Sequence, residues 1–178
     1  MKFFLRPTLW LVLLASCLFA GCASPARTTE MVAKKVPQAA ATHEPVVVSV
    51  QGGDKTNPLW VSKISNENFS AALVESLKQT GLFKSVDTSG DDACRLTTTI
   101  EDLEQPIMGL DMTVSLRIDW LLVRTSDGQD LWHDKILSTY TATVGDNLDG
   151  ALRLRVANEG AARQNIEQGL AKLAAVKF

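Results

Sequence analysis

Alternating apolar and polar residues in the second half of the chain constrain the fold most strongly. From 112 to 122 every second residue is large and apolar, and most residues between them are polar. Such alternation is typical of a β-strand with one buried and one solvated face. Residues 94–101 show the same period, and another strand begins near Gln129 after the turn 126–128. The sequence therefore predicts neighbouring strands of a sheet with one face in water.

The turn at 126–128 fixes the register of the last two strands. A two-residue Asp-Gly turn would set Asp119 opposite Ile136 and mix the two faces. A three-residue loop with Gly128 in the left-handed bulge position sets apolar residues opposite apolar residues and polar residues opposite polar residues. Because a slip of one residue turns every side chain to the other face, burial favours the three-residue loop. The predicted pairs are Leu122 with Trp132, Ile118 with Ile136, Val114 with Tyr140, Asp119 with Lys135 and Arg124 with Asp130.

Two helices are expected. Ser65 is a typical N-cap for a helix running to Thr80, and Gly81 fits the left-handed position after its end. A second helix begins after Asn147 or Asp149. The predicted buried stripe of the first helix is Phe69, Ala72, Leu73, Ser76 and Leu77, and that of the second is Leu152, Val156, Ala162, Ile166, Leu170 and Leu173. Gly160 and Gly169 are tolerable if the second helix lies close to the sheet.

These elements, with a first strand at 46–50 and a short one at 82–86, follow in the order β-α-β-β-β-β-α. The order predicts a single α+β domain at 46–178, with an antiparallel-dominated mixed sheet of about four to five strands and two helices on one face. Residues 22–45 are rich in Ala, Thr, Pro and Lys without an apolar period, so we expect a flexible tether there.

The N-terminus reads as a secretory signal peptide over residues 1–21. A short cationic start precedes an apolar run from Leu9 to Ala20, and small residues follow. The alternative is an N-terminal membrane helix. The run is shorter than the roughly 20 apolar residues that a spanning helix needs.

Phe19-Ala20-Gly21-Cys22 resembles the bacterial lipobox, with Phe19 where Leu is usual. The resemblance implies that Cys22 becomes the first mature residue and carries a diacylglyceryl thioether and an amide-linked acyl chain such as palmitate. Two or more chains anchor a protein stably, whereas one binds only marginally. Ala23 after the cysteine resembles the outer-membrane sorting choice, which implies a periplasm-facing, lipid-anchored protein.

A second resemblance concerns the folded part. Phe69-x3-Leu73-x3-Leu77 followed by Gly81-Leu82-Phe83-x2-Val86 resembles small envelope lipoproteins and modules. These include the auxiliary lipoproteins of ABC-type lipid transporters, the lipopolysaccharide-assembly lipoprotein and the TolB amino-terminal domain. The resemblance covers most of 46–173 and implies architecture, and it assigns no functional residue.

The charge balance and the small number of histidines and cysteines argue against several classes of function. The 18 basic and 20 acidic residues leave no basic excess for nucleic acid, and the signal peptide removes two of the basic ones. We expect no cofactor and no metal site, because the two histidines, His43 and His133, form no cluster with ligand spacing. Cys94, alone in the mature domain, is either a small buried hydrophobe or a nucleophile. The acidic residues Glu101, Asp102 and Glu104 lack a cation-binding loop.

Two further features keep two interpretations each. His133 near Asp134 is either a weak general base or a strand-surface residue. Arg155, Glu159 and Arg163, spaced four apart, form either an anion site or a solvated charge ladder.

We therefore expect a non-catalytic, outer-membrane-anchored lipoprotein that binds a protein partner in an envelope assembly or transport system. Trp60 and Met108 are the candidate contacts, although Trp60 can equally close the edge of the core. The alternative is an envelope lipid carrier or hydrolase that uses a pocket between helices and sheet.

Overall fold

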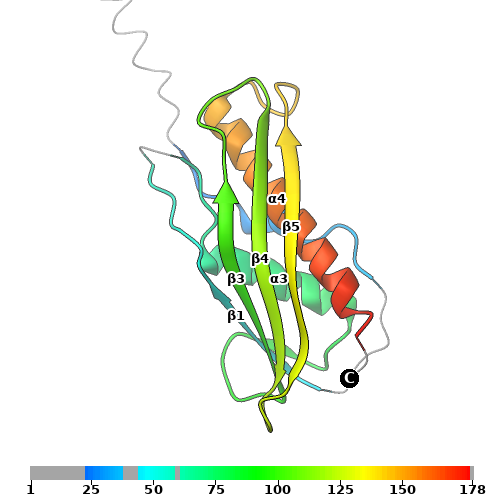
Figure 1. Ribbon diagram of the computed structural model, residues 1–178. Coiled ribbons are helices and arrows are strands. Elements are labelled where there is room, and N and C mark those ends of the chain that lie inside the picture. The colour runs from blue at the N-terminus through cyan, green and yellow to red at the C-terminus, as the bar shows by residue number, and fades with distance from the viewer. Residues whose placement is uncertain (1–22, 38–43, 59–60, 177–178) are drawn as a thin grey trace, which may run out of the picture.

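A computed structural model describes residues 23–37, 44–58 and 61–176 (Figure 1). The elements run in the order α2 (Thr28–Met31), β1 (Val46–Gln51), α3 (Asn66–Thr80), β2 (Val86–Asp87), β3 (Cys94–Glu104), β4 (Met112–Arg124), β5 (Asp130–Ala142) and α4 (Gly150–Leu173). The predicted α+β class and the order of the strands and long helices are confirmed.

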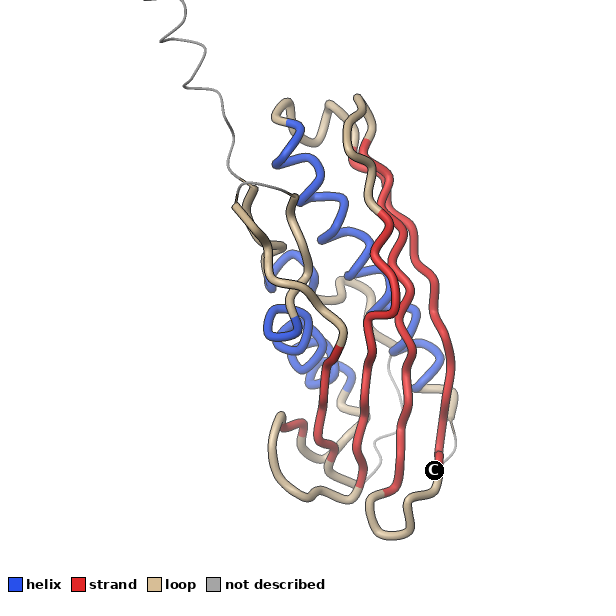
Figure 2. The backbone as a smooth tube through the Cα atoms, turned by 60° about the vertical axis from the view of Figure 1, so that its left-hand side comes forward, coloured by secondary structure: helices blue, strands red, loops and turns tan. Residues whose placement is uncertain are grey.

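The five strands form one mixed sheet in the order β2-β1-β3-β4-β5. Strands β3, β4 and β5 are antiparallel, whereas β1 is parallel to both β2 and β3. Helices α3 and α4 lie on the same side of the sheet, and no helix of the described residues covers the other side (Figure 2). The sheet therefore has one buried face and one open face, as the alternating residues predict.

The register of β4 and β5 is the predicted one over most of its length. Leu122 pairs with Trp132, Ile118 with Ile136 and Val114 with Tyr140, and Asp119 lies opposite Lys135. Gly128 has a φ of 70°, which is the left-handed conformation expected of it. One predicted pair is wrong, because a register shift after Leu122 sets Asp130 opposite Val123 instead of Arg124. The Arg124 guanidinium instead donates to Asp127 and Gln129 within the turn.

Helix α3 forms as the sequence indicates. The Ser65 hydroxyl accepts from the Asn68 amide at 3.2 Å, and Gly81 ends the helix with a φ of 63°. All five residues of the predicted stripe are buried. The expected strand at 82–86 is shorter, because only Val86 and Asp87 pair with β1, while Leu82 and Phe83 are buried ahead of it.

Helix α4 is capped by Asp149, whose carboxylate accepts from the amides of Ala151 and Leu152. The predicted stripe is right from Ala162 onward and wrong at the start, where Leu152 and Val156 are only half-buried. Leu154, Ala157 and Ala161 are buried instead, so the first turns face the sheet with a different set of residues.

Glycines let α4 lie against the sheet. A Cβ on Gly160 would lie 2.4 Å from the Tyr140 ring, and one on Gly169 would lie 2.6 Å from the Trp120 ring. Cys94 is buried in the same core, as the hydrophobic interpretation predicts. Within the described residues, no helix combines the length and the apolar character needed to cross a bilayer.

The expectation of a flexible tether over 22–45 is wrong for its first part. Ala26, Met31 and Ala33 belong to the hydrophobic core, and α2 packs on both α3 and α4. Met31 has no exposed surface. The packed domain therefore includes the segment 23–36, named here the N-terminal segment.

Candidate functional site

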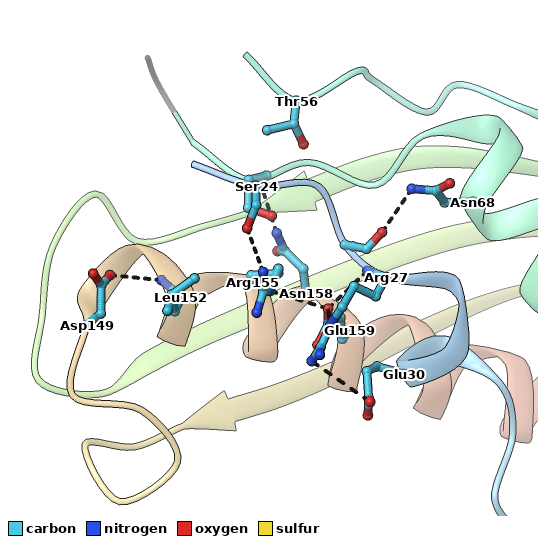
Figure 3. Close-up of polar contacts among 12 residues, drawn as sticks. Ser24, Arg27, Glu30, Thr56, Asn68, Asp149, Leu152, Arg155, Asn158 and Glu159 are labelled. Carbon is cyan, nitrogen blue, oxygen red and sulfur yellow. Dashed lines mark hydrogen bonds and ion pairs between the residues drawn. The ribbon is translucent and has the colours of Figure 1, made fainter. Parts of the chain in front are cut away.

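The N-terminal segment is held by a row of side chains along α4 that we call the clamp: Arg155, Glu159, Arg163 and Glu167. These residues recur every four positions, so they lie on one side of the helix. Figure 3 shows Arg155 and Glu159 directed toward Ser24 and Arg27 of the segment. Arg155, Glu159 and Arg163 were expected to form either an anion site or a solvated charge ladder, and Glu167 extends the row. Its charges instead bind the protein's own chain.

Glu159 is the centre of the clamp. Its Oε1 accepts from the backbone amide and the Nε of Arg27, both at 3.0 Å, and its Oε2 accepts from Nη2 at 3.1 Å. Arg155 Nε lies 3.5 Å away, which makes an ion pair without a hydrogen bond. Glu159 is only 2% exposed, so these partners compensate the cost of burying its charge. The hydrogen bond with Glu159 raises the pKa of the Arg27 guanidinium.

The other clamp residues bind the segment on either side of Arg27. Arg155 Nη1 donates to Ser24 Oγ at 2.6 Å, and Arg163 Nη1 donates to the Glu30 carbonyl at 2.6 Å. Glu167 accepts from the amides of Lys34 and Lys35. The segment therefore runs along α4 and is bound at four successive turns of the helix.

Helix α3 and the loop after β1 complete the docking. The Asn68 amide donates to the Ala26 carbonyl at 2.9 Å, and the Ala33 amide donates to Ser76 Oγ at 2.9 Å. The amide of Ala23, the first described residue, donates to the Pro58 carbonyl at 2.9 Å. Cys22, the predicted lipidation site, lies outside the described residues. In the sequence it directly precedes Ala23, whose amide is bound by the Pro58 carbonyl.

A second feature lies in two loops at the end of the sheet where β4 begins. Ile107, Met108, Leu110 and Leu148, named here the apolar tip, are 91, 81, 78 and 85% exposed. Met108 was predicted as a contact residue and is accessible. The partner contact itself stays a prediction. The other predicted contact, Trp60, lies outside the described residues.

Arg153 joins the two loops of the apolar tip. Its Nη1 donates to the carbonyls of Asn147 and Leu148 at 2.7 and 3.2 Å, and its Nη2 donates to the Gly109 carbonyl at 3.0 Å. Arg153 is 5% exposed, although it serves loops at the surface. This buried cation fixes the backbone that presents the four exposed side chains.

His133 and Asp134, the predicted general base and its neighbour, do not lie on the same face of the sheet. His133 lies on the open face, 51% exposed, and its Nε2 is 2.8 Å from Asp119 Oδ1. The expected neighbour Asp134 instead accepts from Lys172 of α4 at 2.7 Å. Alternation along β5 explains this, because adjacent residues point to opposite faces.

The acidic residues near the end of β3 do not come together as a metal site. Glu101 pairs with Lys135 across β4. Among the described residues, no group of three or more His, Cys, Asp or Glu side chains could hold a metal ion. Beside Glu101 and Asp102, where β1 has ended, Gly52, Asp54 and Lys63 help to line a hollow of about 260 Å³. It lies at the edge of the sheet, whereas the carrier alternative expects a pocket between helices and sheet.

Comparison with known proteins shows the fold. The sequence matches no described protein family and none of the curated proteins. Protein XCC0632 of Xanthomonas campestris, assigned to DUF330, has a similar structure with a TM-score of 0.58 and 11% identity over 80% of this chain and 89% of that one. The PelC dodecamer of Paraburkholderia phytofirmans gives 0.54 and 16% over 81% and 96%. Protein CT253 of Chlamydia trachomatis gives 0.54 and 8% over 76% and 98%. The chain thus has an α+β architecture found in other bacterial proteins.

Proposed function

We propose that this protein is an outer-membrane-anchored lipoprotein, facing the periplasm, that serves without catalysis as a partner-binding component of an envelope assembly or transport system. The observation that carries the proposal is the clamp. The residue that follows the lipobox cysteine begins a segment bound along α4 by Arg155 and Glu159. An acyl anchor on Cys22 would therefore hold the domain itself at the membrane and leave it little freedom to swing.

The open face of the sheet is the surface that we assign to a partner. Strand β5 is a long edge strand, and its backbone can pair with a further strand. Leu137 of β5 lies on the open face and is 54% exposed. A second copy of this chain is one possible partner, since the structurally similar PelC forms a dodecamer.

Replacement of Cys22 by serine tests the anchor. We expect the Cys22→Ser protein to be released into the soluble periplasm or to stay unprocessed, measured by fractionation and intact mass. Cys94→Ser is the matched control, because Cys94 is buried and should leave fractionation unchanged. A Cys22→Ser protein of mature length that still fractionates with the outer membrane would place the anchor elsewhere.

In-cell photocrosslinking tests the partner role. A photoreactive residue at Leu137 should capture a discrete protein, while the same residue at the exposed Lys78 of α3 should not. Mass spectrometry then separates a foreign subunit from a second copy of the chain. Lipid adducts would favour the carrier alternative, and empty lanes at both positions would contradict the partner role of the open face.

A further inference from the structure

We infer that the apolar tip inserts into the lipid layer beside the acyl anchor, so that the protein is held at two points with the sheet standing away from the membrane. This inference rests on the proposed lipidation of Cys22. It adds a second membrane contact, made by side chains, and a fixed orientation of the domain.

The first argument is the composition of the tip. Its four residues are large, apolar and more than three-quarters exposed. Clustered exposed apolar side chains on a soluble domain mark a contact with a protein or a membrane. The opposite end of the sheet has a different character, because its turn at Ser126–Gly128 is polar and Arg124 and Asp127 bind each other there. The most exposed large apolar side chains are thus gathered at one end of the β4–β5 hairpin, and Leu137 in the middle of β5 is exposed to 54%.

The second argument is the level along α4 at which the tip and the N-terminal segment are held. Arg153 binds the tip backbone at Gly109 and Leu148, whereas Arg155 binds Ser24 of the N-terminal segment. The Cα atoms of residues 153 and 155 are about 3 Å apart along the helix axis. Arg153 and Arg155 point to different sides of α4, so the tip and Ser24 are held on two sides of the helix at the same level along its axis. Figure 1 shows the described chain beginning in the half of the molecule that holds both tip loops.

The third argument is that the tip is preorganised. The Arg153 guanidinium fixes both loops from beneath, and the Asp146 carboxylate accepts from the amide and hydroxyl of Thr143 in the second loop. An ordered apolar surface loses little conformational freedom when it enters the interface, which favours binding.

Charge selects the kind of lipid. The loops at 104–111 and 143–149 contain Glu104, Asp111, Asp146 and Asp149, all exposed, and no lysine or arginine. Anionic headgroups would be repelled at this surface, so zwitterionic lipid is the ligand that fits the tip.

The two contacts together define an orientation. Strand β4 has 13 residues. At about 3.4 Å per residue the strand spans roughly 44 Å. With the apolar tip in the interface, the β4–β5 turn would lie that far out, and the open face and the β5 edge would stand clear of the membrane.

Depth-dependent fluorescence on the full-length lipoprotein tests the inference. The Met108→Cys and Leu148→Cys variants are labelled with an environment-sensitive dye, and Ser126→Cys is the matched control at the other end of the hairpin. Cys94 is buried, so the parent protein checks background labelling. The protein is reconstituted into phosphatidylcholine–phosphatidylethanolamine vesicles with or without lipids that carry a spin label near the headgroup.

We expect blue-shifted emission and several-fold stronger quenching by spin-labelled lipid at both tip positions than at residue 126. Replacing part of the lipid with phosphatidylglycerol should weaken the quenching, and high salt should restore it. Tip probes that match the Ser126 probe would overturn the inference while the anchored protein still floats with the vesicles. A blue shift without lipid quenching would assign the tip to a second copy and would also overturn it. Failure of the parent protein to float would instead overturn the proposed anchor and this inference with it.

Discussion

The two sides of helix α4 are built on different principles. The side toward the sheet depends on close packing, with Gly160 against the Tyr140 ring and Gly169 against the Trp120 ring. The side toward the N-terminal segment adds charges and hydrogen bonds centred on Glu159 to the apolar packing of Met31. When packed apolar contacts are broken, water does not compensate for them. When polar groups lose their protein partners, they can form hydrogen bonds with water instead. The comparison predicts that the segment opens more readily than the sheet, although opening also exposes Ala26, Met31 and Ala33 of the core.

The largest effect should come from adding an atom on the packed side. In Gly169→Ala the new Cβ would meet Trp120, which is fully buried and whose Nε1 donates to Asn165 at 3.0 Å. We expect a loss of about 2–3 kcal/mol in the free energy of unfolding, measured with urea, because overpacked cores strain side chains and backbone.

The matched control for this variant is Gly150→Ala in the first turn of the same helix. Its nearest neighbours to a new Cβ lie at 3.8 Å, so that variant should be neutral or slightly stabilising. If Gly169→Ala behaves like Gly150→Ala, the packed side is looser than the comparison requires.

A smaller, local effect should follow from Glu159→Gln on the polar side. The substitution keeps the shape and removes the charge that Arg27 and Arg155 share. Hydrogen bonds to charged groups contribute about 1.5–3 kcal/mol, so the segment should open more often. Hydrogen exchange of the Ala26 and Ala33 amides should accelerate, while the amides of β4 keep their protection.

The exposed Glu75→Gln in α3 is the control for the loss of a charge. Equal acceleration in β4 and in the segment would show that the two sides of α4 unfold as one unit, which would break the comparison.

The parts of the fold that could be predicted from the sequence are those set by patterns within a few residues. Alternation, the Gly128 turn and the Ser65 cap act within a few residues, so the β4–β5 register and helix α3 followed from the sequence. The one wrong pair, Arg124 with Asp130, failed because a bulge cannot be read from alternation alone. The parallel pairing of β1 joins residues far apart in the chain, and its β-branched run gives no strand direction.

The sequence of the N-terminal segment contains almost nothing that predicts its docking on α3 and α4. Met31 is its one fully buried large side chain, and no apolar period surrounds it. The clamp has the spacing of an ordinary surface ladder, and the partner of Glu159 is 132 positions away along the chain. Of the apolar tip, Met108 was predicted from its loop and Leu148 was not, because only the fold brings the two loops together.

The smallest effect should come from an ion pair at the rim of the packed side, Asp134 with Lys172. The hydrogen bond from Lys172 lowers the pKa of the Asp134 carboxyl below its ordinary value. A carboxyl with a lowered folded-state pKa stabilises the fold above its unfolded-state pKa, and this contribution is lost as the pH falls through the folded-state pKa. Both side chains are partly exposed, at 33 and 48%, so little stability is at stake.

An NMR titration of the Asp134 carboxyl carbon measures the shift, and Lys172→Met should return the pKa toward its usual range while urea unfolding at neutral pH hardly changes. A large loss of stability in Lys172→Met would mean that charge, and not packing alone, holds α4 to the sheet.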